Sequence, residues 1–428
     1  MRIDFITLGC SKNLVDSEFL SKQLENQGYK VYHDATRPCG KIIIINTCGF
    51  IGDAKEESIN TILFFAKKKK EKKIERLYVM GCLSQRYMTA LKSEIPEVDK
   101  FYGKFNFYDL LTDLGKNYSS TLRLERSITT GHYAYVKIAE GCNRTCSYCA
   151  IPIITGKHKS RTIEDIIQEV KLLTENGVKE IQLIAQDLSF YGQDLYHQSK
   201  LAELIKRISD INGVEWLRLH YTYPTQFPYD ILPVINEREN ICKYLDIALQ
   251  HISNRMLKLM RRNITANETR LLLNRIREEV PNIHLRTTLL VGHPQETEDD
   301  FNELIDFVKE TLFERLGAFT YSHEEGTYAH QHYKDDIPFE IKKERLNKLM
   351  FEQQIISNKL NSKKIGKEYK VIIDRYSDNF YIGRTEYDSP EVDCEVLIKK
   401  ENKPISIGNF YNVKITDAID FDLYGTLI

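Results

Sequence analysis

Two long stretches of the sequence alternate apolar, strand-like runs with amphipathic helical segments, and this alternation restricts the chain to α/β architectures with parallel sheets. In the first stretch, the runs RIDFITLG, KIIIINTC and RLYVMGC are separated by helical segments at 16–28 and 57–73. We expect the first of these helices to begin with a cap at Asp16 and to stop at Gly28. Continuous apolar strands joined by helices predict a parallel sheet that is covered on both faces.

From residue 130 onward the alternation restarts with longer units. The strand candidates are YAYVKI, EIQLIAQ, EWLRLHY, YLDIALQ, HLRTTLLVG and LGAFTYS, and all but the last are followed by helical segments such as 162–177 and 296–313. Six parallel strands with crossover helices predict an open or partial (β/α) barrel, whose chemistry lies at the carboxyl ends of its strands. A long amphipathic helix over 339–360 leads out of this barrel.

The pattern changes again after Gly366. Short alternating runs, EYKVIID, NFYIGRT, CEVLIKK and FYNVKITDAI, are spaced by turn residues. This pattern predicts a small antiparallel β-barrel. The sequence therefore indicates a multidomain α/β protein, with a parallel α/β domain at 1–120, a partial (β/α) barrel at 128–358 and a small antiparallel β-barrel at 360–428.

Length and charge remove several classes of protein. The chain has 428 residues, which at roughly 100–200 residues per domain allows two to four domains. A net charge of −1 does not suit a protein that coats DNA. Mean hydropathy is −0.40, and no apolar run approaches the roughly 18 residues of a membrane span. The first ten residues lack the basic-then-apolar layout of a secretion signal, so we expect a cytoplasmic protein.

Three of the nine cysteines stand close together in GCNRTCSYC, on the loop that leaves the first predicted barrel strand. Cys142, Cys146 and Cys149 have the spacing C-x3-C-x2-C. Three thiolates can bind three irons of a [4Fe–4S] cluster and leave the fourth iron without a protein ligand. S-adenosylmethionine can occupy that iron, where one-electron reduction cleaves it to a 5′-deoxyadenosyl radical. The alternative is a zinc site, which needs a fourth ligand such as His132 or His158.

Three further cysteines share a position relative to the predicted strands. Cys10, Cys48 and Cys82 each directly follow an apolar strand, in FITLGC, IIIINTC and YVMGC. Parallel strands bring their carboxyl ends to one edge of a sheet, where open α/β sheets place ligands. We therefore expect these thiols to converge on a second [4Fe–4S] cluster with an open iron, for which Gly9 and Gly81 leave room. The alternative is that they are small apolar residues that fill the ends of the sheet.

Three residues near these motifs are candidates for binding S-adenosylmethionine. Tyr148 precedes the last cysteine of its motif, and we expect it to shield the cluster and to lie near the adenine; the alternative is a loop tyrosine packed on its own barrel. Gly292 and Glu296 stand at the exit of the fifth barrel strand, where barrels of this type bind their ligands. The remaining cysteines have no partner by spacing and are interpreted as ordinary thiols: Cys39, Cys242 and Cys394.

These segments together resemble the methylthiotransferase family of radical S-adenosylmethionine enzymes, and the resemblance covers the whole chain. TLGCSKNLVDSE, NTCGFI and VMGCLSQRY are similar to that family's amino-terminal cluster domain, GCNRTCSYCAIP is similar to its radical motif, and the last barrel resembles its TRAM domain. Other segments resemble the branch that modifies ribosomal protein S-twelve rather than tRNA, namely GCSKNLVDSE, ALQHISNRMLKLMRR, FTYSHEEGTYA and IGRTEYDSPEVD.

The resemblance implies an enzyme with two [4Fe–4S] clusters and S-adenosylmethionine as cofactors. The three strand-end cysteines would hold an auxiliary cluster whose sulfur is methylated, and the cysteines of the GCNRTCSYC loop would hold the cluster that generates the radical. The radical would remove a hydrogen from the β-carbon of an aspartate on ribosomal protein S-twelve, and this carbon would collect the methylthio group. An electron donor such as flavodoxin or ferredoxin is also implied, without a tRNA substrate or a membrane.

Two rival interpretations are open at this point. A tRNA adenosine methylthiotransferase would carry the same clusters, but residues 360–428 hold ten Lys and Arg against twelve Asp and Glu, whereas RNA binding favours a basic face. The acidic run GRTEYDSPEVD instead suits a basic protein, so we expect it to dock the substrate through Glu386, Asp388, Glu391 and Asp393. The other rival is an iron–sulfur electron carrier, although a pure carrier fills all four ligand positions of its cluster.

Overall fold

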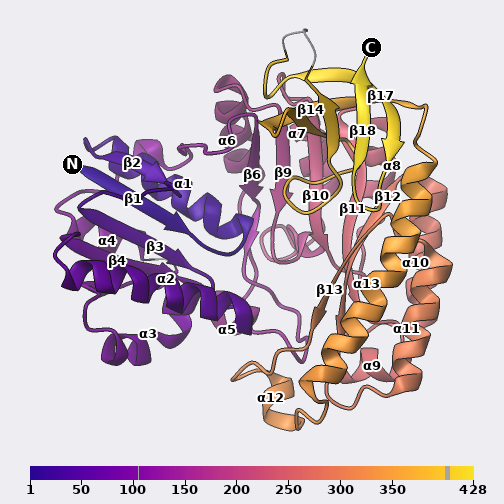
Figure 1. The fold of residues 1–428 in the computed structure, drawn as a ribbon, viewed down its shortest axis with the longest axis horizontal. Helices are drawn as coiled ribbons and strands as arrows, with labels where there is room; N and C mark the ends of the chain where they lie inside the picture. Colours follow the sequence, from indigo (N-terminus) through magenta and orange to yellow (C-terminus); the bar gives the residue numbers. More distant parts are fainter. Residues whose placement is uncertain (105, 401–404) are drawn as a thin grey trace.

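In the computed structural model, which describes residues 1–104, 106–400 and 405–428, the amino-terminal domain is built on a five-stranded parallel sheet in the order β2-β1-β3-β4-β5 (Figure 1). At its centre, Ile43 and Ile45 of β3 pack toward α2 and α3, whereas Ile42 and Ile44 pack toward α1 and α4. The predicted parallel sheet with helices on both faces is confirmed. The elements are β1 (Arg2–Thr7), α1 (Ser11–Glu25), β2 (Lys30–His33), β3 (Ile42–Thr47), α2 (Gly52–Lys70), β4 (Arg76–Gly81), α3 (Cys82–Glu94), β5 (Lys100–Phe101) and α4 (Phe107–Asp113).

The start of α1 differs from the prediction. The helix begins at Ser11, with Cys10 in the N-cap position and no side-chain cap. The predicted cap at Asp16 is therefore wrong: this residue is buried in the middle of the helix, where its carboxylate is paired with Lys137 of the next domain. An aspartate that is needed for a contact between domains cannot be told from a capping aspartate by its position in the sequence.

The central domain is a six-stranded, all-parallel sheet in the order β13-β12-β11-β10-β9-β6, which confirms the predicted partial barrel. Helices α6, α7, α8, α10 and α11 cover one side of it with a single large apolar core. The elements are η1 (Ser120–Leu122), β6 (Tyr133–Lys137), β7 (Ala139–Glu140), α5 (Ile151–Thr155), β8 (Lys159–Ser160), α6 (Ile163–Glu175), β9 (Glu180–Ile184), η2 (Leu188–Phe190), α7 (Leu201–Ser209), β10 (Trp216–Thr222), α8 (Ile231–Glu237), β11 (Ile241–Gln250), α9 (Asn254–Leu259), α10 (Ala266–Glu279), β12 (His284–Val291), α11 (Glu298–Thr311), β13 (Arg315–Thr320), α12 (Tyr328–His332) and α13 (Phe339–Ser362).

The two faces of this central sheet differ in polarity. Because side chains alternate along a strand, Leu217 and Leu219 of β10 join the apolar core under the helices, and Arg218 and His220 point to the opposite side. Both of these polar residues are buried. The side of the sheet without helices is therefore a buried polar surface, whose charges must be paired within the protein.

The carboxyl-terminal domain is a closed five-stranded barrel in the order β14-β15-β16-β18-β17. The predicted small barrel is confirmed, with one strand that the sequence reasoning missed: β18 is only five residues long and carries Gly425 in its middle. It pairs parallel to β16, so the barrel is not antiparallel throughout. Residues 401–404 of this predicted domain, like residue 105 of the first, lie outside the described residues. The strands are β14 (Glu368–Ser377), β15 (Phe380–Thr385), β16 (Val396–Lys399), β17 (Phe410–Ala418) and β18 (Leu423–Leu427).

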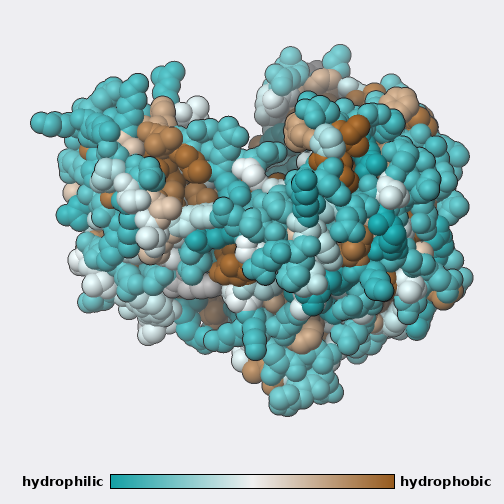
Figure 2. Space-filling model, turned by 90° about the horizontal axis from the view of Figure 1, so that it is seen from below, coloured by the Kyte–Doolittle hydropathy of each residue, from teal (hydrophilic) through white to brown (hydrophobic). Residues whose placement is uncertain are grey.

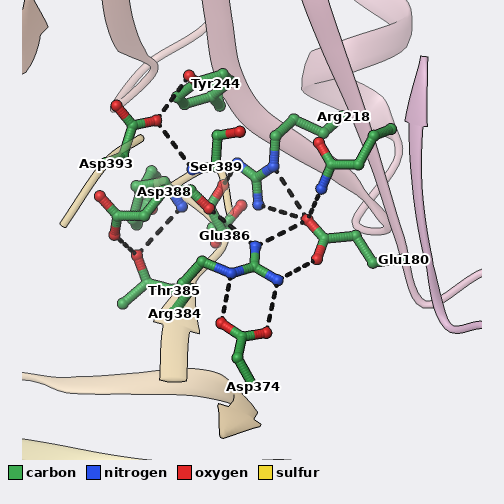
Figure 3. Close-up of polar contacts among 12 residues, drawn as sticks. Glu180, Arg218, Tyr244, Asp374, Arg384, Thr385, Glu386, Asp388, Ser389 and Asp393 are labelled. Atoms are coloured by element: carbon green, nitrogen blue, oxygen red, sulfur yellow. Dashed lines mark hydrogen bonds and ion pairs between the residues drawn. The ribbon is translucent and has the colours of Figure 1, made fainter. Parts of the chain in front are cut away.

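The carboxyl-terminal barrel is attached to the amino ends of the central strands (Figure 1) by a network of buried charges (Figure 3). Glu180, the first residue of β9, is 0% exposed and accepts hydrogen bonds from Arg218 at 3.0 Å and from Arg384 of the barrel at 2.7 Å. Arg384 also binds Asp374 at 2.6 Å. Burial opposes the charge of Glu180, but the two guanidinium groups outweigh it and lower the pKa of this carboxyl group.

The acidic run of the barrel is part of the same contact between the barrel and the central domain. Asp388 is fully buried and accepts a hydrogen bond from Arg315 Nε at 2.8 Å, and Asp393 accepts one from Tyr244 Oη at 2.8 Å. Burial raises the pKa of Asp388, but Arg315 and Lys364 outweigh this effect and bring it to about 2. The expectation that Asp388 and Asp393 dock a partner is wrong, because both carboxylates face the central domain.

We predict that replacing Arg384 with Met lowers the free energy of unfolding by about 3–5 kcal/mol, because the substitution leaves the carboxylates of Glu180 and Asp374 buried without their main partner. Arg375 of the same domain is the matched control. It pairs with Glu395 at 2.6 Å but is 51% exposed, so Arg375→Met should cost about 0–1 kcal/mol. Urea denaturation measures both changes, and equal losses would show that the joint is no stronger than a surface ion pair.

Candidate functional site

The cysteines of the GCNRTCSYC loop line a cavity at the carboxyl end of the central sheet. Cys142, Cys146 and Cys149 lie between β7 and α5, and the cavity of about 160 Å³ that they line also contains the ring of Tyr148. Cys142 Sγ accepts a hydrogen bond from the backbone N–H of Arg144 at 3.4 Å. The loop therefore brings the three predicted ligands and the predicted shielding tyrosine to one cavity.

The surroundings of these thiols suit a bound metal cluster. Burial raises the pKa of Cys142 to about 11 and also raises that of Cys149. Both thiols are therefore neutral at pH 7 unless a cation compensates for the lost hydration. Iron supplies that compensation and deprotonates a coordinating thiol. Thiolates are also the donors that iron–sulfur clusters use, so the donor set fits the group that the sequence predicts.

Arg262 is the most important residue of this site that the sequence reasoning missed. It is 2% exposed, and its Nη1 lies 3.4 Å from both Cys146 Sγ and Tyr148 Oη. Its guanidinium group also lies 4.0 Å above the ring of Tyr223, whose hydroxyl is 3.5 Å from Cys146 Sγ. Arg262 thus provides a buried positive charge beside thiolate ligands. The segment LKLMRR offered a signal, but only the fold shows which arginine turns inward.

The strands that end at the cavity do so in a strained conformation. Tyr221 at the end of β10 and Gln250 at the end of β11 have φ angles of +64° and +71°, and both line the cavity. Residues other than glycine adopt such angles at a cost, and they are concentrated at ligand sites. Tyr221 is further held by Lys12 of the amino-terminal domain, whose Nζ lies 3.8 Å from the centre of its ring.

The three strand-end cysteines stand on loops that meet at the carboxyl edge of the amino-terminal sheet, and their role as cluster ligands stays a prediction. A Cβ atom added to Gly9 would lie 2.8 Å from Cys48 Sγ, which places the loop before Cys10 directly against Cys48. Burial raises the pKa of Cys82 to about 12; Lys104 opposes this shift, whereas Cys10 and Cys48 add to it. The thiols of Cys10 and Cys48 are thus close enough to Cys82 to raise its pKa.

The two glycines beside these cysteines are both tightly packed. A Cβ atom on Gly9 would lie 2.6 Å from Cys48 Cβ, so this glycine lets the loop before Cys10 pack against Cys48, and its role of leaving room for a cluster stays a prediction. A Cβ atom on Gly81 would instead lie 2.4 Å from Asn46 Oδ1 and 2.5 Å from the backbone oxygen of Thr47. Gly81 is therefore required for close packing of β4 against β3, and its predicted role of leaving room for a cluster is wrong.

The segment that follows Cys48 reaches the cavity of the GCNRTCSYC loop across the boundary between the domains. Phe50, two residues after Cys48, lines the cavity of the GCNRTCSYC loop. Figure 2 shows the side on which the central strands end, where hydrophobic residues form patches on a mostly hydrophilic face. Phe50 and Ile153, on segments that follow the two sets of cysteines, are 37% and 49% exposed. The amino-terminal domain thus supplies part of the lining of this cavity.

Ion pairs fix the amino-terminal domain at both edges of the central sheet. Near β6, the carboxylate of Glu140 forms an ion pair with Lys137 of the central domain at 2.7 Å. It forms a second ion pair, at 3.1 Å, with Lys104 of the amino-terminal domain. Near β13, Glu324 is 2% exposed and pairs with Lys55 at 2.8 Å and Arg86 at 2.6 Å. Because both edges are held, the two sets of cysteines keep a fixed separation.

The zinc alternative does not match the positions of its proposed fourth ligands. His132 Nε2 lies 2.7 Å from Asp374 Oδ1 in the joint with the carboxyl-terminal barrel, and His158 Nε2 lies 3.2 Å from Ser160 Oγ. Within residues 1–104, 106–400 and 405–428, no three His, Cys, Asp or Glu side chains converge as a single metal ion requires. Ligands of a cluster bind separate irons and need not converge in this way.

Gly292 and Glu296 do not line the cavity of the cysteines. Glu296 is 4% exposed, accepts a hydrogen bond from the N–H of Gly292 at 2.8 Å and pairs with Arg345 of α13 at 2.7 Å. A Cβ atom on Gly292 would lie 2.4 Å from Lys342. The two residues thus connect the end of β12 to α13, and their assignment to S-adenosylmethionine stays a prediction that the geometry does not support.

Comparison with known families agrees with the three parts of the fold. The model described as the Radical SAM superfamily matches residues 136–308, that of the Uncharacterized protein family UPF0004 matches residues 2–103, and that of the TRAM domain matches residues 365–428. A radical SAM domain implies S-adenosylmethionine and a [4Fe–4S] cluster. No helix among the described residues is both long and apolar enough to cross a membrane.

Similar proteins extend over the whole chain. A protein of Parabacteroides distasonis named ribosomal protein uS12 methylthiotransferase RimO is 61% identical over 100% of this chain and 99% of its own length. Another of the same name, from Cytophaga hutchinsonii, is 50% identical over 100% and 98%. The chain belongs to the RimO family of methylthiotransferases. This assignment confirms the resemblance seen in the sequence and supports the ribosomal-protein branch rather than the tRNA branch.

Solved structures resemble this RimO family member in fold. The radical S-adenosylmethionine methyltransferase TsrM from Kitasatospora setae, solved with cobalamin and a [4Fe–4S] cluster, has a TM-score of 0.54 at 13% identity and covers 74% of each chain. The cobalamin-dependent radical enzyme OxsB has a TM-score of 0.53 at 12% identity and covers 82% of this chain and 56% of its own. At these identities the likeness concerns the fold alone.

We predict that Glu324→Gln loosens the amino-terminal domain of this RimO family member. The substitution removes the negative charge shared by Lys55 and Arg86, so the free energy of local opening should fall by about 1–3 kcal/mol. Hydrogen–deuterium exchange should become faster in α2. Glu325→Gln is the control, because this residue contacts Arg86 only through its main-chain carbonyl, at 2.6 Å. Unchanged exchange in both variants would contradict a fixing role for Glu324.

Proposed function

We propose that the chain transfers a methylthio group to the β-carbon of an aspartate in ribosomal protein uS12. The observation that carries this proposal is that this member of the RimO family has one cysteine triad lining a cavity at the ends of the central strands, and three more cysteines at the strand ends of the adjoining domain, whose Phe50 lines the same cavity. A single triad would suffice to cleave S-adenosylmethionine. The second triad supplies a place where a sulfur can be held next to the radical, which is what distinguishes sulfur transfer from hydrogen abstraction alone.

The proposed ligands divide between the two domains. Cys142, Cys146 and Cys149 hold the cluster that binds and reduces S-adenosylmethionine, and the three strand-end cysteines hold the auxiliary cluster that carries the sulfur. Support for the first set comes from their shared cavity and raised thiol pKa values. Support for the second set comes from the mutual effect of the thiols and from the cation of Lys104 beside them.

The protein's own residues prepare the site in three ways. Arg262 places a fixed positive charge beside Cys146, which offsets the negative charge of a thiolate-bound cluster. Phe50 and Tyr148 line the cavity with aromatic rings, which keeps water away from a reactive carbon radical. The strained ends of β10 and β11 hold Tyr221 and Gln250 toward the same space. These groups bind and orient, and none of them needs to transfer a proton.

The substrate and partners follow from the family. Proteins 50–62% identical to this chain are named uS12 methylthiotransferases, and ribosomal proteins are made in the cytoplasm, where we propose that the enzyme acts. An electron donor such as flavodoxin or ferredoxin is required by the one-electron cleavage of S-adenosylmethionine. The similar proteins named above support the ribosomal-protein branch rather than the tRNA alternative.

The proposed substrate is tested by the mass of the small-subunit ribosomal proteins from cells with and without the gene. We expect uS12 to gain the mass of one methylthio group in place of a hydrogen, and fragmentation should locate the change on an aspartate side chain. If the methylthio group is found on tRNA nucleosides and uS12 is unmodified, this result contradicts the proposal and favours the tRNA alternative.

The division of labour between the triads gives a second prediction. Replacing the three cysteines of the GCNRTCSYC loop with Ala should remove about four irons per chain and abolish formation of 5′-deoxyadenosine. Replacing the three strand-end cysteines should also remove about four irons, yet leave that cleavage intact while uS12 is no longer modified. The triple replacement of Cys39, Cys242 and Cys394 by Ala is the control and should keep the full iron content. Loss of cleavage in both test variants would contradict separate roles.

A further inference from the structure

A second cavity lies at the opposite end of the central sheet from the cysteines. It has a volume of about 360 Å³ and is lined by the starts of β12 and β13, the residues that follow α13, and the carboxyl-terminal barrel. Its charged lining is unbalanced: one acidic residue, Glu314, stands against the cationic residues Arg315, Lys363, Lys364 and Lys367. Two separate segments, the start of β13 and the stretch after α13, thus bring positive charge to one polar pocket.

Lys364 is the feature that most requires an explanation. It is 7% exposed, and its Nζ has no hydrogen-bond partner among the residues that the structure describes. Burying an ammonium group without an acceptor is costly. Burial and the nearby Arg315 both lower the pKa of Lys364, and Asp388 only partly offsets them.

The acidic groups near Lys364 already have partners. Asp388 accepts hydrogen bonds from both Arg315 and Thr385. Glu314 accepts a hydrogen bond from the N–H of Leu285 at 2.9 Å and is bound by Arg277 at 3.3 Å. Both carboxylates thus hydrogen-bond to other groups, and neither is a hydrogen-bond partner of Lys364 Nζ among the described residues.

His284 lines the same cavity as these cations. Its ring is stacked on Tyr387 of the carboxyl-terminal barrel, with the centres 4.1 Å apart at 25°. Its Nδ1 has no hydrogen-bond partner among the described residues. Burial, together with Lys364 and Arg315, holds the pKa of His284 well below its usual value. The imidazole is therefore neutral and offers a ring nitrogen to a ligand.

We propose that this cavity binds an oxyanion of the phosphate type through Lys364, with Arg315 and the rim residues Lys363 and Lys367 as supporting cations. A phosphate group suits this lining because it has several acceptor oxygens that can bind donors from different segments at once. Such an anion would join the central domain, the end of α13 and the carboxyl-terminal barrel. The site is independent of the methylthiotransfer chemistry, which takes place at the other end of the strands.

Calorimetric titration of the reconstituted full-length protein with inorganic phosphate, at ionic strength held constant with potassium chloride, tests the site. Lys364→Met should weaken phosphate binding by roughly tenfold or more, as loss of a charged hydrogen bond predicts. Lys348→Met is the control, since this lysine lies on α13, ahead of the segment that holds Lys364, is 54% exposed and forms an ion pair with Glu344 at 2.8 Å; the phosphate affinity of this variant should stay within about twofold of the wild type.

Thermal unfolding gives a second measurement. Phosphate should raise the Tm of the wild type and of Lys348→Met, but not that of Lys364→Met. An equal rise in all three would reveal only the general stabilising effect of this salt and would overturn the proposal. The proposal would also be overturned if Lys364→Met had a higher Tm than the wild type and phosphate left the Tm of the wild type unchanged.

The source of the phosphate group is distinguished by comparing inorganic phosphate with adenosine 5′-monophosphate. Equal affinities support a site for the free ion, and tighter binding of the nucleotide supports a site for a phosphorylated organic molecule. Lys363→Met, which changes a residue on the exposed rim and should not affect folding, is expected to weaken both ligands several-fold, in line with a supporting cation near a phosphate group. No binding of either ligand to the wild type would refute the site.

Discussion

Buried carboxylates paired across domain boundaries hold this molecule in one arrangement. Glu180 binds Arg384 of the carboxyl-terminal barrel, and Glu324 binds Arg86 of the amino-terminal domain. An apolar interface can slide by an ångström at little cost, whereas a buried ion pair that is pulled apart leaves an uncompensated charge. The pairs therefore determine where each domain sits, and the distance between the two sets of cysteines follows from that placement.

The site depends on this arrangement because neither domain is sufficient alone. The central sheet supplies one triad and the charge of Arg262, and the amino-terminal sheet supplies the other triad and the ring of Phe50. Both sets of thiols lie at the carboxyl ends of parallel strands, where backbone geometry leaves loops free to hold ligands. The site is thus composed of loops at the carboxyl ends of parallel strands from two adjoining domains.

Much of this could be predicted from the sequence, and the failures have a common cause. The isoleucine run of β3, the strand-end positions of the cysteines and the helix at 339–360 carry their signals locally, in periodicity and spacing. Asp16, Asp388 and Gly81 were misassigned because their roles depend on partners far away in the sequence: Lys137, Arg315 and Asn46. Arg262 was missed for the same reason. Local patterns identify elements and ligand types, but a charge reveals its function only when its partner is known.

The position of the carboxyl-terminal barrel has a consequence for access. It closes the amino ends of the central strands, where Asp388 and Asp393 reach Arg315 and Arg286, and the amino-terminal domain covers one flank. The barrel thus occupies the end of the central sheet opposite to the cavity lined by Cys142, Cys146 and Cys149, and the ring of Phe50, which is 37% exposed, lies at that cavity. A partner therefore approaches the cavity over the carboxyl ends of the strands and not past the barrel.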